Sequence, residues 1–152
     1  MGMTMPTDLK IMHKQNSLQS AMLIFAFCIA LSATLGALFI GEVLGQMPCV
    51  LCWYQRIAMF PLVLILGIAA YRDDPSAIIY AIPLSLMGLV VAAWHTGLYV
   101  GLIPEPIVPC TKSGPSCSSS EMAFFEIPIP LMSLISFAAI TTLLLISGRK
   151  KT

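Results

Sequence analysis

Charge is the scarcest property of this sequence. Only 10% of its 152 residues are charged, whereas 58% are hydrophobic. A soluble domain of this size needs a largely polar surface, so the composition argues against a soluble globular protein. The net charge of +1 gives no basic field that would attract nucleic acid. The chain also lacks a nucleotide-binding motif and a haem C-x-x-C-H motif, because Trp53 rather than a histidine follows Cys52.

Four apolar segments dominate the chain instead. They run from about 18 to 40, 50 to 71, 77 to 103 and 127 to 147. Each is close to the ~20 residues that cross a hydrocarbon core, and such segments must be helical because lipid offers the backbone no hydrogen-bond partner. The sequence therefore predicts an all-α integral membrane four-helix bundle, a single membrane domain over residues 1–152. The polar stretch up to Ser17 is expected to be loosely ordered.

The basic residues predict the orientation of this bundle. With four spans, six of them fall on one side: Lys10, Lys14, Arg72, Arg149, Lys150 and Lys151. Only Arg56 and Lys112 fall on the other side. Because lysine and arginine are enriched in cytoplasmic segments, both termini are expected to be cytoplasmic. The loops at about 41–49 and 104–126 are then expected to face outward.

Four of the five cysteines fall in or beside these outer loops, namely Cys49, Cys52, Cys110 and Cys117. An oxidising outer compartment is where disulfides form and persist. Cys28 lies inside the first span and is expected to be a small buried hydrophobe.

Cys49 and Cys52 form a C-x-x-C motif at the start of the second helix, just after Pro48. Thiolates at a helix N-terminus are stabilised by the helix dipole and by free N–H groups. Such a pair suits disulfide exchange, although a structural disulfide and half of a metal site remain open alternatives.

Cys110 and Cys117 enclose six residues rich in turn formers, so their loop can bring the two sulfurs together. A plain loop disulfide is one alternative, and a zinc ion shared by all four outer cysteines is another. As two pairs on one face, the cysteines can pass a disulfide between them by thiolate attack. Net oxidation still needs an electron acceptor, and without a nucleotide or haem motif an acceptor dissolved in the membrane is the simplest expectation.

Two polar residues within the spans are candidates for binding such an acceptor. Arg56 lies one helical turn deeper than Cys52 on the same face, where it can stabilise the Cys52 thiolate and the negative oxygen of a reduced quinone. A cation within a span is costly and suggests function, although an interfacial anchor is the alternative. His95 is expected at a similar depth in the third span. A quinone ring could then lie between Arg56 and His95, with His95 donating a hydrogen bond or proton; a packing histidine is the alternative.

The other polar and aromatic residues near the predicted interfaces have simpler interpretations. Glu126 is expected at the start of the fourth helix, where a carboxylate suits the helix dipole. Trp53, Tyr54 and Trp94 are interpreted as interfacial aromatic residues.

The residues 48–56, Pro-Cys-Val-Leu-Cys-Trp-Tyr-Gln-Arg, followed by the apolar run 61–69, resemble the DsbB family of disulfide bond formation proteins. The likeness is greatest to the shorter, BdbC-type members, and residues 109–117 and 127–137 fit the second loop and fourth helix of that subfamily. The resemblance implies a thiol:quinone oxidoreductase of the bacterial cytoplasmic (inner) membrane, with its redox loops on the extracytoplasmic side.

The resemblance also implies roles for single residues. Family members reoxidise a soluble thioredoxin-like, DsbA-like dithiol protein, whose cysteine would attack at Cys110. Cys117 would pass electrons to Cys49, and Cys52 would face a quinone, either ubiquinone or menaquinone, beside Arg56. His95 matches a family position near the quinone site. The long-loop members differ, because their second cysteine pair is far apart whereas six residues intervene here.

Three other functions remain to be weighed. A vitamin K epoxide reductase-like enzyme also uses four helices and two cysteine pairs, but its membrane C-x-x-C motif comes late in the chain, whereas Cys49 and Cys52 come first here. A non-enzymatic membrane protein with structural disulfides or zinc leaves the register of Arg56 with Cys52 unexplained. A carrier that moves reducing electrons outward has the same features, since direction depends on redox potentials.

Overall fold

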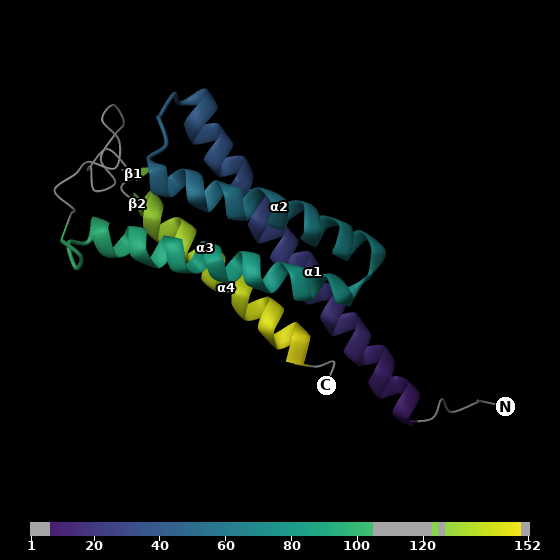
Figure 1. Ribbon diagram of the computed structural model, residues 1–152. Helices are drawn as coiled ribbons and strands as arrows, with labels where there is room; N and C mark the ends of the chain where they lie inside the picture. The colour runs from purple at the N-terminus through teal and green to yellow at the C-terminus, as the bar shows by residue number, and fades with distance from the viewer. Residues whose placement is uncertain (1–6, 105–122, 125–126, 150–152) are drawn as a thin grey trace.

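The computed structural model describes residues 7–104, 123–124 and 127–149. Within these ranges lie four long helices, α1 (Thr7–Leu38), α2 (Val50–Arg72), α3 (Ile78–Tyr99) and α4 (Ile129–Arg149). Each contains or belongs to a segment that is long and apolar enough to cross a membrane. The helices pack in a ring, α1 on α2, α2 on α3, α3 on α4 and α4 on α1 (Figure 1). The predicted all-α four-helix bundle is therefore confirmed.

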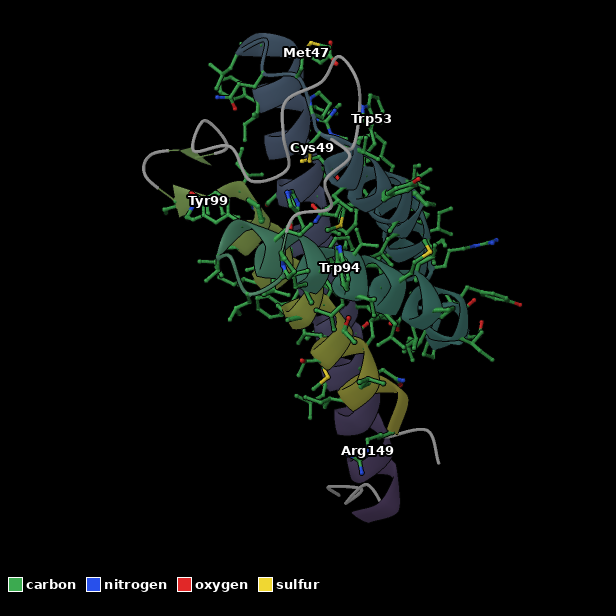
Figure 2. All side chains as sticks on the ribbon, turned by 60° about the vertical axis from the view of Figure 1, so that its left-hand side comes forward. Met47, Cys49, Trp53, Trp94, Tyr99 and Arg149 are labelled. Carbon is green, nitrogen blue, oxygen red and sulfur yellow. The ribbon has the colours of Figure 1, made fainter. Side chains whose placement is uncertain are left out.

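Short elements join these helices. They are a π-helical turn η1 (Phe39–Val43), a 3-10 turn η2 (Pro75–Ala77), and the strands β1 (Ala123–Phe124) and β2 (Ile127–Pro128), which pair in antiparallel fashion. The start of α2, the end of α3 and the β1–β2 pair gather at one end of the bundle (Figure 1). Met47, Cys49 and Trp53 lie at this end, and Arg149 lies at the opposite end (Figure 2).

Small residues let the helices approach closely, as is usual in membrane bundles. The buried face of α3 repeats every three or four residues and consists of Ile78, Ala81, Ser85, Gly88, Ala92, His95 and Leu98. The larger apolar side chains of the same helix, such as Ile79 and Val90, are exposed on the outside of the bundle. This distribution suits a bundle surrounded by lipid, because lipid does not drive large apolar groups inward.

Polar contacts hold the helices together at the end remote from Cys49. The Gln19 side chain of α1 donates a hydrogen bond to the Ser147 carbonyl of α4 at 3.1 Å. The Ser20 hydroxyl of α1 donates a hydrogen bond to the Asp73 carboxylate. Asp73 is the C-cap residue of α2 and adopts the left-handed conformation, with a φ of 51°. Asp74 then accepts the Ser76 N–H at 2.9 Å and so starts η2. These contacts fix α1 against both of its neighbours at this end.

The helix boundaries differ from the sequence-based segments at three places. The stretch before Ser17 was expected to be loosely ordered, but α1 is already helical from Thr7. The third segment was expected to reach 103, but α3 ends at Tyr99 because the chain turns at Gly101, whose φ is +78°. The fourth was expected from 127, but Ile127–Pro128 pairs as β2 and α4 begins at Ile129. Apolar composition alone does not reveal where such turns end a helix.

Cys28 also differs from its expected environment. It was predicted to be a small buried hydrophobe, but its side chain is exposed on the outer surface of α1. Leu23, Ala26 and Ala30 instead form the buried face of that helix. Within a span, both faces of a helix are apolar, so hydrophobicity could not tell which face Cys28 occupies.

Gly88 tests the close approach of α3 and α4. A Cβ atom at this position would lie 2.0 Å from Cε1 of Phe137, whose ring is fully buried. We expect Gly88→Ala to lower the free energy of unfolding by about 1–3 kcal/mol, because the ring has to move within a packed core. Thermal denaturation in detergent should show a lower Tm. Gly148→Ala is the control, since its Cβ would make only an ordinary 3.6 Å contact with Ile78. Equal melting of the two variants would contradict tight packing at Gly88.

Candidate functional site

The first turn of α2 holds a pair of thiols. Cys49 is the N-cap residue of α2, with φ −69° and ψ 169°, and its Sγ accepts the Cys52 backbone N–H at 3.3 Å. The two Sγ atoms lie 2.9 Å apart. A sulfur in this position receives the stabilisation that a helix N-terminus offers to negative charge. The C-x-x-C motif thus starts the helix and places two sulfurs in contact.

The two thiols have different surroundings. Cys49 is only 1% exposed and faces the interior of the bundle, towards α3. Cys52 is partly exposed and lines a cavity. One sulfur is therefore open to a molecule in the cavity, and the other is not.

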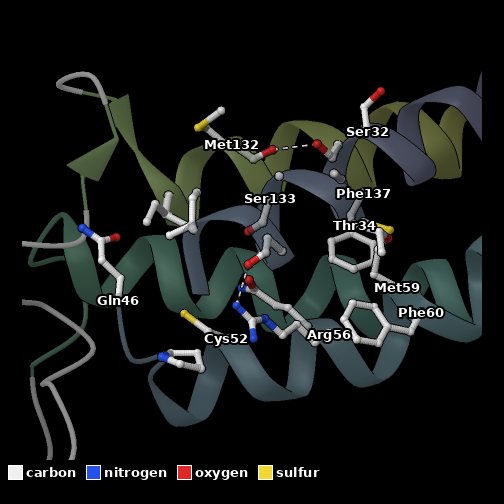
Figure 3. A pocket seen from close by; sticks show the side chains of 18 of the residues that line it. Ser32, Thr34, Gln46, Cys52, Arg56, Met59, Phe60, Met132, Ser133 and Phe137 are labelled. Carbon is white, nitrogen blue, oxygen red and sulfur yellow. Dashed lines mark hydrogen bonds between the residues drawn. The ribbon is translucent and has the colours of Figure 1, made fainter. Parts of the chain in front are cut away.

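The cavity beside Cys52 has a volume of about 730 Å³. Its walls come from α1, from the connection that precedes α2, from α2 itself and from α4 (Figure 3). Most of the lining is apolar, and the polar side chains among it include Ser32, Thr34, Gln46, Gln55, Arg56, Ser133 and Ser136. Pockets of this size and character bind small organic molecules.

Arg56 lines the same cavity, one turn along α2 from Cys52 (Figure 3). Its Nη2 donates a hydrogen bond to the Ala37 carbonyl of α1 at 2.8 Å, and its guanidinium carbon lies 5.5 Å from the centre of the Trp53 ring. Gly41, within η1, leaves room for the guanidinium, since a Cβ there would lie 2.8 Å from Nη2. Arg56 and Cys52 thus line the same cavity from neighbouring turns of α2.

His95 lies within the bundle, next to the thiol pair. Its side chain is fully buried, and its Nε2 lies 3.7 Å from the Cys49 sulfur. Its Nδ1 lies 3.2 Å from Nε2 of the Gln55 amide. His95 is not among the residues that line the cavity. The described residues thus place His95 beside the thiol pair, and its contact with a quinone opposite Arg56 stays a prediction.

The Cys49 thiol of the reduced pair is expected to hold its proton strongly. The hydrogen bond to Cys52 and, next, burial raise the pKa of the Cys49 thiol to about 12. The contact with His95 and the backbone N–H of Cys52 act in the opposite direction, towards a lower pKa. Cys49 is therefore protonated in the reduced pair at neutral pH.

The two thiols and His95 lie close enough together for disulfide exchange or for metal binding. Ligand atoms of Cys49, Cys52 and His95 lie within 4.8 Å of one another, and zinc binds thiolate and imidazole. The two sulfurs are 2.9 Å apart, so a small movement would let them form a disulfide.

Several predicted residues lie outside the described ranges. Cys110, Cys117, Lys112 and Glu126 all belong to this group. Trp53, Tyr54 and Trp94 are each more than half exposed on the bundle surface, where interfacial aromatics were expected.

Sequence reasoning missed three residues of the site. Gln55, three residues after Cys52, is buried and contacts His95. Gly41 accommodates Arg56, and the Thr34 hydroxyl oxygen lies buried at the cavity without a hydrogen-bond partner among the described residues. The helical spacing of Gln55 from Cys52 was the available signal, since a polar residue within a span needs a partner. Gly41 and Thr34 gave no signal before α1 was placed beside α2.

The unequal environments predict unequal alkylation of the reduced protein. With a pKa of about 12, roughly one Cys49 thiol in ten thousand is ionised at pH 8. We expect iodoacetamide at pH 8 to modify Cys52 well before Cys49, as read by peptide mass spectrometry. Denatured protein is the control, in which the two thiols should react at similar rates. Faster modification of Cys49 in the folded protein would contradict the assignment.

Comparison with known proteins shows the family of the chain. The family described as "Disulfide bond formation protein DsbB" matches residues 19–147. A probable disulfide formation protein of Metapseudomonas resinovorans is 52% identical over 132 residues, which cover 86% of this chain and 92% of the relative. Disulfide bond formation protein C of Bacillus subtilis is 39% identical over 129 residues, which cover 82% of this chain and 91% of the relative.

A probable disulfide formation protein of Chlamydia caviae is 41% identical over 134 residues, or 88% of this chain and 96% of that protein. No solved structure matches the chain significantly. The family match spans all four helices, and the relatives are matched over nearly their full length. With its four membrane-type helices and its paired thiols, the chain belongs to the DsbB family of disulfide bond formation proteins.

Proposed function

We propose that this protein is a thiol:quinone oxidoreductase that reoxidises a thioredoxin-like, DsbA-like dithiol protein and passes the electrons to a membrane quinone. Family membership implies disulfide oxidoreductase activity. The observation that carries the proposal further is the cavity that Cys52 and Arg56 line together. It gives a redox-active sulfur and a fixed cation to the same small-molecule site.

The cavity residues fit a quinone. The volume of about 730 Å³ accepts a ring and part of an apolar tail, and its walls are mostly apolar. The Thr34 hydroxyl lacks a partner among the described residues, so it is free to donate to a ring carbonyl. When bound, ubiquinone or menaquinone would supply an acceptor for two electrons and two protons.

Cys52, Arg56 and Cys49 have different roles in this reaction. Cys52 faces the cavity, so electrons leave the thiol pair through its sulfur. Arg56 stabilises the negative charge that develops in the cavity, and its hydrogen bond to Ala37 holds the guanidinium there. Cys49 forms the new disulfide with Cys52, from which it is separated by 2.9 Å. Both thiols lose their protons, so the acceptor gains two electrons and two protons.

The rest of the relay belongs to the same proposal. Cys110 would receive the attack of the partner protein, and Cys117 would exchange with Cys49. Both termini would be cytoplasmic, and these cysteines would lie on the extracytoplasmic side of the bacterial inner membrane. Support comes from the clustering of Cys49, the end of α3 and the β1–β2 pair at one end of the bundle (Figures 1 and 2).

Quinone reduction by the purified protein in detergent tests this function. A reduced thioredoxin-like oxidant protein is the electron donor, and a ubiquinone or menaquinone analogue is the acceptor. We expect wild type to turn over, Cys52→Ser to be inactive, and Arg56→Ala to lose about 10-fold or more in kcat/KM, as expected when a hydrogen bond to a charged group is lost. Gly148→Ala should match wild type. If wild type reduces no quinone with such a donor, the proposal fails.

Gly41 provides a test of how Arg56 is held. The methyl group of Gly41→Ala would lie 2.8 Å from Nη2 of Arg56, so the guanidinium has to shift. We expect a several-fold rise in KM for quinone, with little change in Tm because the end of a flexible side chain moves. In an Arg56→Ala background the same substitution should have little further effect. An equal effect in both backgrounds would show that Gly41 acts independently of Arg56.

A further inference from the structure

The buried polar groups behind the thiol pair form a short chain. Gln55 is 6% exposed and His95 is fully buried. His95 bridges Gln55 of α2 and Cys49 at the start of α2, through its two ring nitrogens. A buried imidazole in a span is costly unless both nitrogens have partners, and here each has one. The partners of His95 are therefore Gln55 and Cys49, and His95 does not line the cavity.

The orientation of the Gln55 amide indicates the tautomer of His95. The Gln55 atom that faces Nδ1 is Nε2, and an amide nitrogen can only donate a hydrogen bond. Nδ1 must then be the acceptor, without a proton. In a neutral imidazole the proton accordingly lies on Nε2, the atom that faces the Cys49 sulfur at 3.7 Å.

We infer that Gln55 is a positioning residue that holds His95 as its Nε2–H tautomer, so that His95 donates a hydrogen bond to Cys49 whenever that sulfur is a thiolate. The inference rests on the proposed function and assigns to the thiol pair a histidine that the sequence had placed at the quinone. His95 contacts a reacting sulfur, and Gln55 acts through His95.

This hydrogen bond would stabilise the Cys49 thiolate that forms during disulfide exchange. An incoming thiolate attacks Cys49, forms a mixed disulfide with it and releases Cys52 as a thiolate. The second thiolate of the same dithiol then forms the new disulfide and releases Cys49 as a thiolate. The two protons lost by the incoming dithiol equal the two that Cys49 and Cys52 take up. The Cys49 sulfur thus carries charge at a site that is 1% exposed and needs a donor there.

The Nε2–H of His95 is a suitable donor for the Cys49 sulfur. A fixed N–H stabilises the thiolate without moving a charge into the bundle, and it is already aligned before exchange begins. The backbone N–H of Cys52 donates to the same sulfur, so the Cys49 thiolate has two donors from two helices.

The experiment measures the ionisation of Cys49 alone. In the full chain carrying Cys52→Ala, the strongest cause of the raised Cys49 pKa is removed. The rate of Cys49 alkylation by iodoacetamide is then followed against pH by peptide mass spectrometry. Three further variants are compared in this background, Gln55→Met, His95→Gln and the two combined. Ser85→Ala is the matched control, since Ser85 is a buried polar residue of α3 whose hydroxyl donates to the Ile82 carbonyl of its own helix.

We expect Gln55→Met to raise the midpoint of the alkylation profile by about one pH unit, because a hydrogen bond to a charged sulfur is lost. The glutamine of His95→Gln has an amide N–H that can reach the position of Nε2, and an amide always offers this donor because it has no tautomers. The midpoint of this variant should therefore stay near that of the Cys52→Ala background. Gln55→Met should then have little effect in the His95→Gln background. Ser85→Ala should leave the midpoint unchanged.

Two results would overturn the inference. One is an unchanged midpoint in Gln55→Met when the variant still elutes as a single species and melts cooperatively. The other is a rise in the midpoint on Gln55→Met that is equally large with His95 present and in the His95→Gln background. Such a result would indicate a general packing effect. Because the assay contains no quinone, the inference fails or stands separately from the proposed function. Quinone reduction by wild type together with a flat Gln55→Met profile would reject only the inference.

Discussion

The hydrogen bond from the Cys52 backbone N–H to the Cys49 sulfur determines the arrangement of the whole site. It makes the sulfur of Cys49 the cap of α2, so the helix begins where the redox pair begins. Once the cap is set, helical geometry dictates that Cys52 points to the next turn and Arg56 to the one after it. The other helices then supply what each of these side chains faces.

The two sides of α2 accordingly have different chemistry. On one side α3 brings His95 to the capping sulfur, and the site there is closed to solvent. On the other side α1 and α4 leave a cavity, and the π-helical turn η1 brings Gly41 and the chain around Ala37 to the guanidinium of Arg56. π-helical turns are uncommon and occur often at functional sites.

The sequence predicted what depends on a single helix and missed what depends on two. The four helices followed from apolar length, and the alignment of Cys52 with Arg56 followed from the helical period. The depth of His95 was also estimated, but its direction depends on how α3 is rotated against α2, and no residue of α3 alone reports that rotation. The sequence therefore suggested a quinone opposite Arg56 as the neighbour of His95, and it did not reveal the contact of His95 with Cys49.

The outward position of Cys28 and the role of Gly41 were hidden for the same reason. Both faces of α1 are apolar, so composition could not select the face that packs inside. Gly41 has meaning only after Arg56 of α2 is placed beside it. The boundaries at Tyr99 and Ile129 depend on a positive φ at Gly101 and on a strand pair, which are local features within otherwise apolar sequence.

The unequal surroundings of the two sulfurs also resolve a chemical conflict. Disulfide exchange needs a thiolate that can leave, whereas electron transfer to a small molecule needs a sulfur that the molecule can touch. A single environment would serve one need at the expense of the other, since opening Cys49 to the cavity would remove its contact with His95. By capping the helix with one sulfur and facing the cavity with the next, three residues along, the fold would meet both needs of the proposed function in one turn of α2. It follows that substitutions behind Cys49 and substitutions in the cavity should impair different steps, although the sulfurs they affect are 2.9 Å apart.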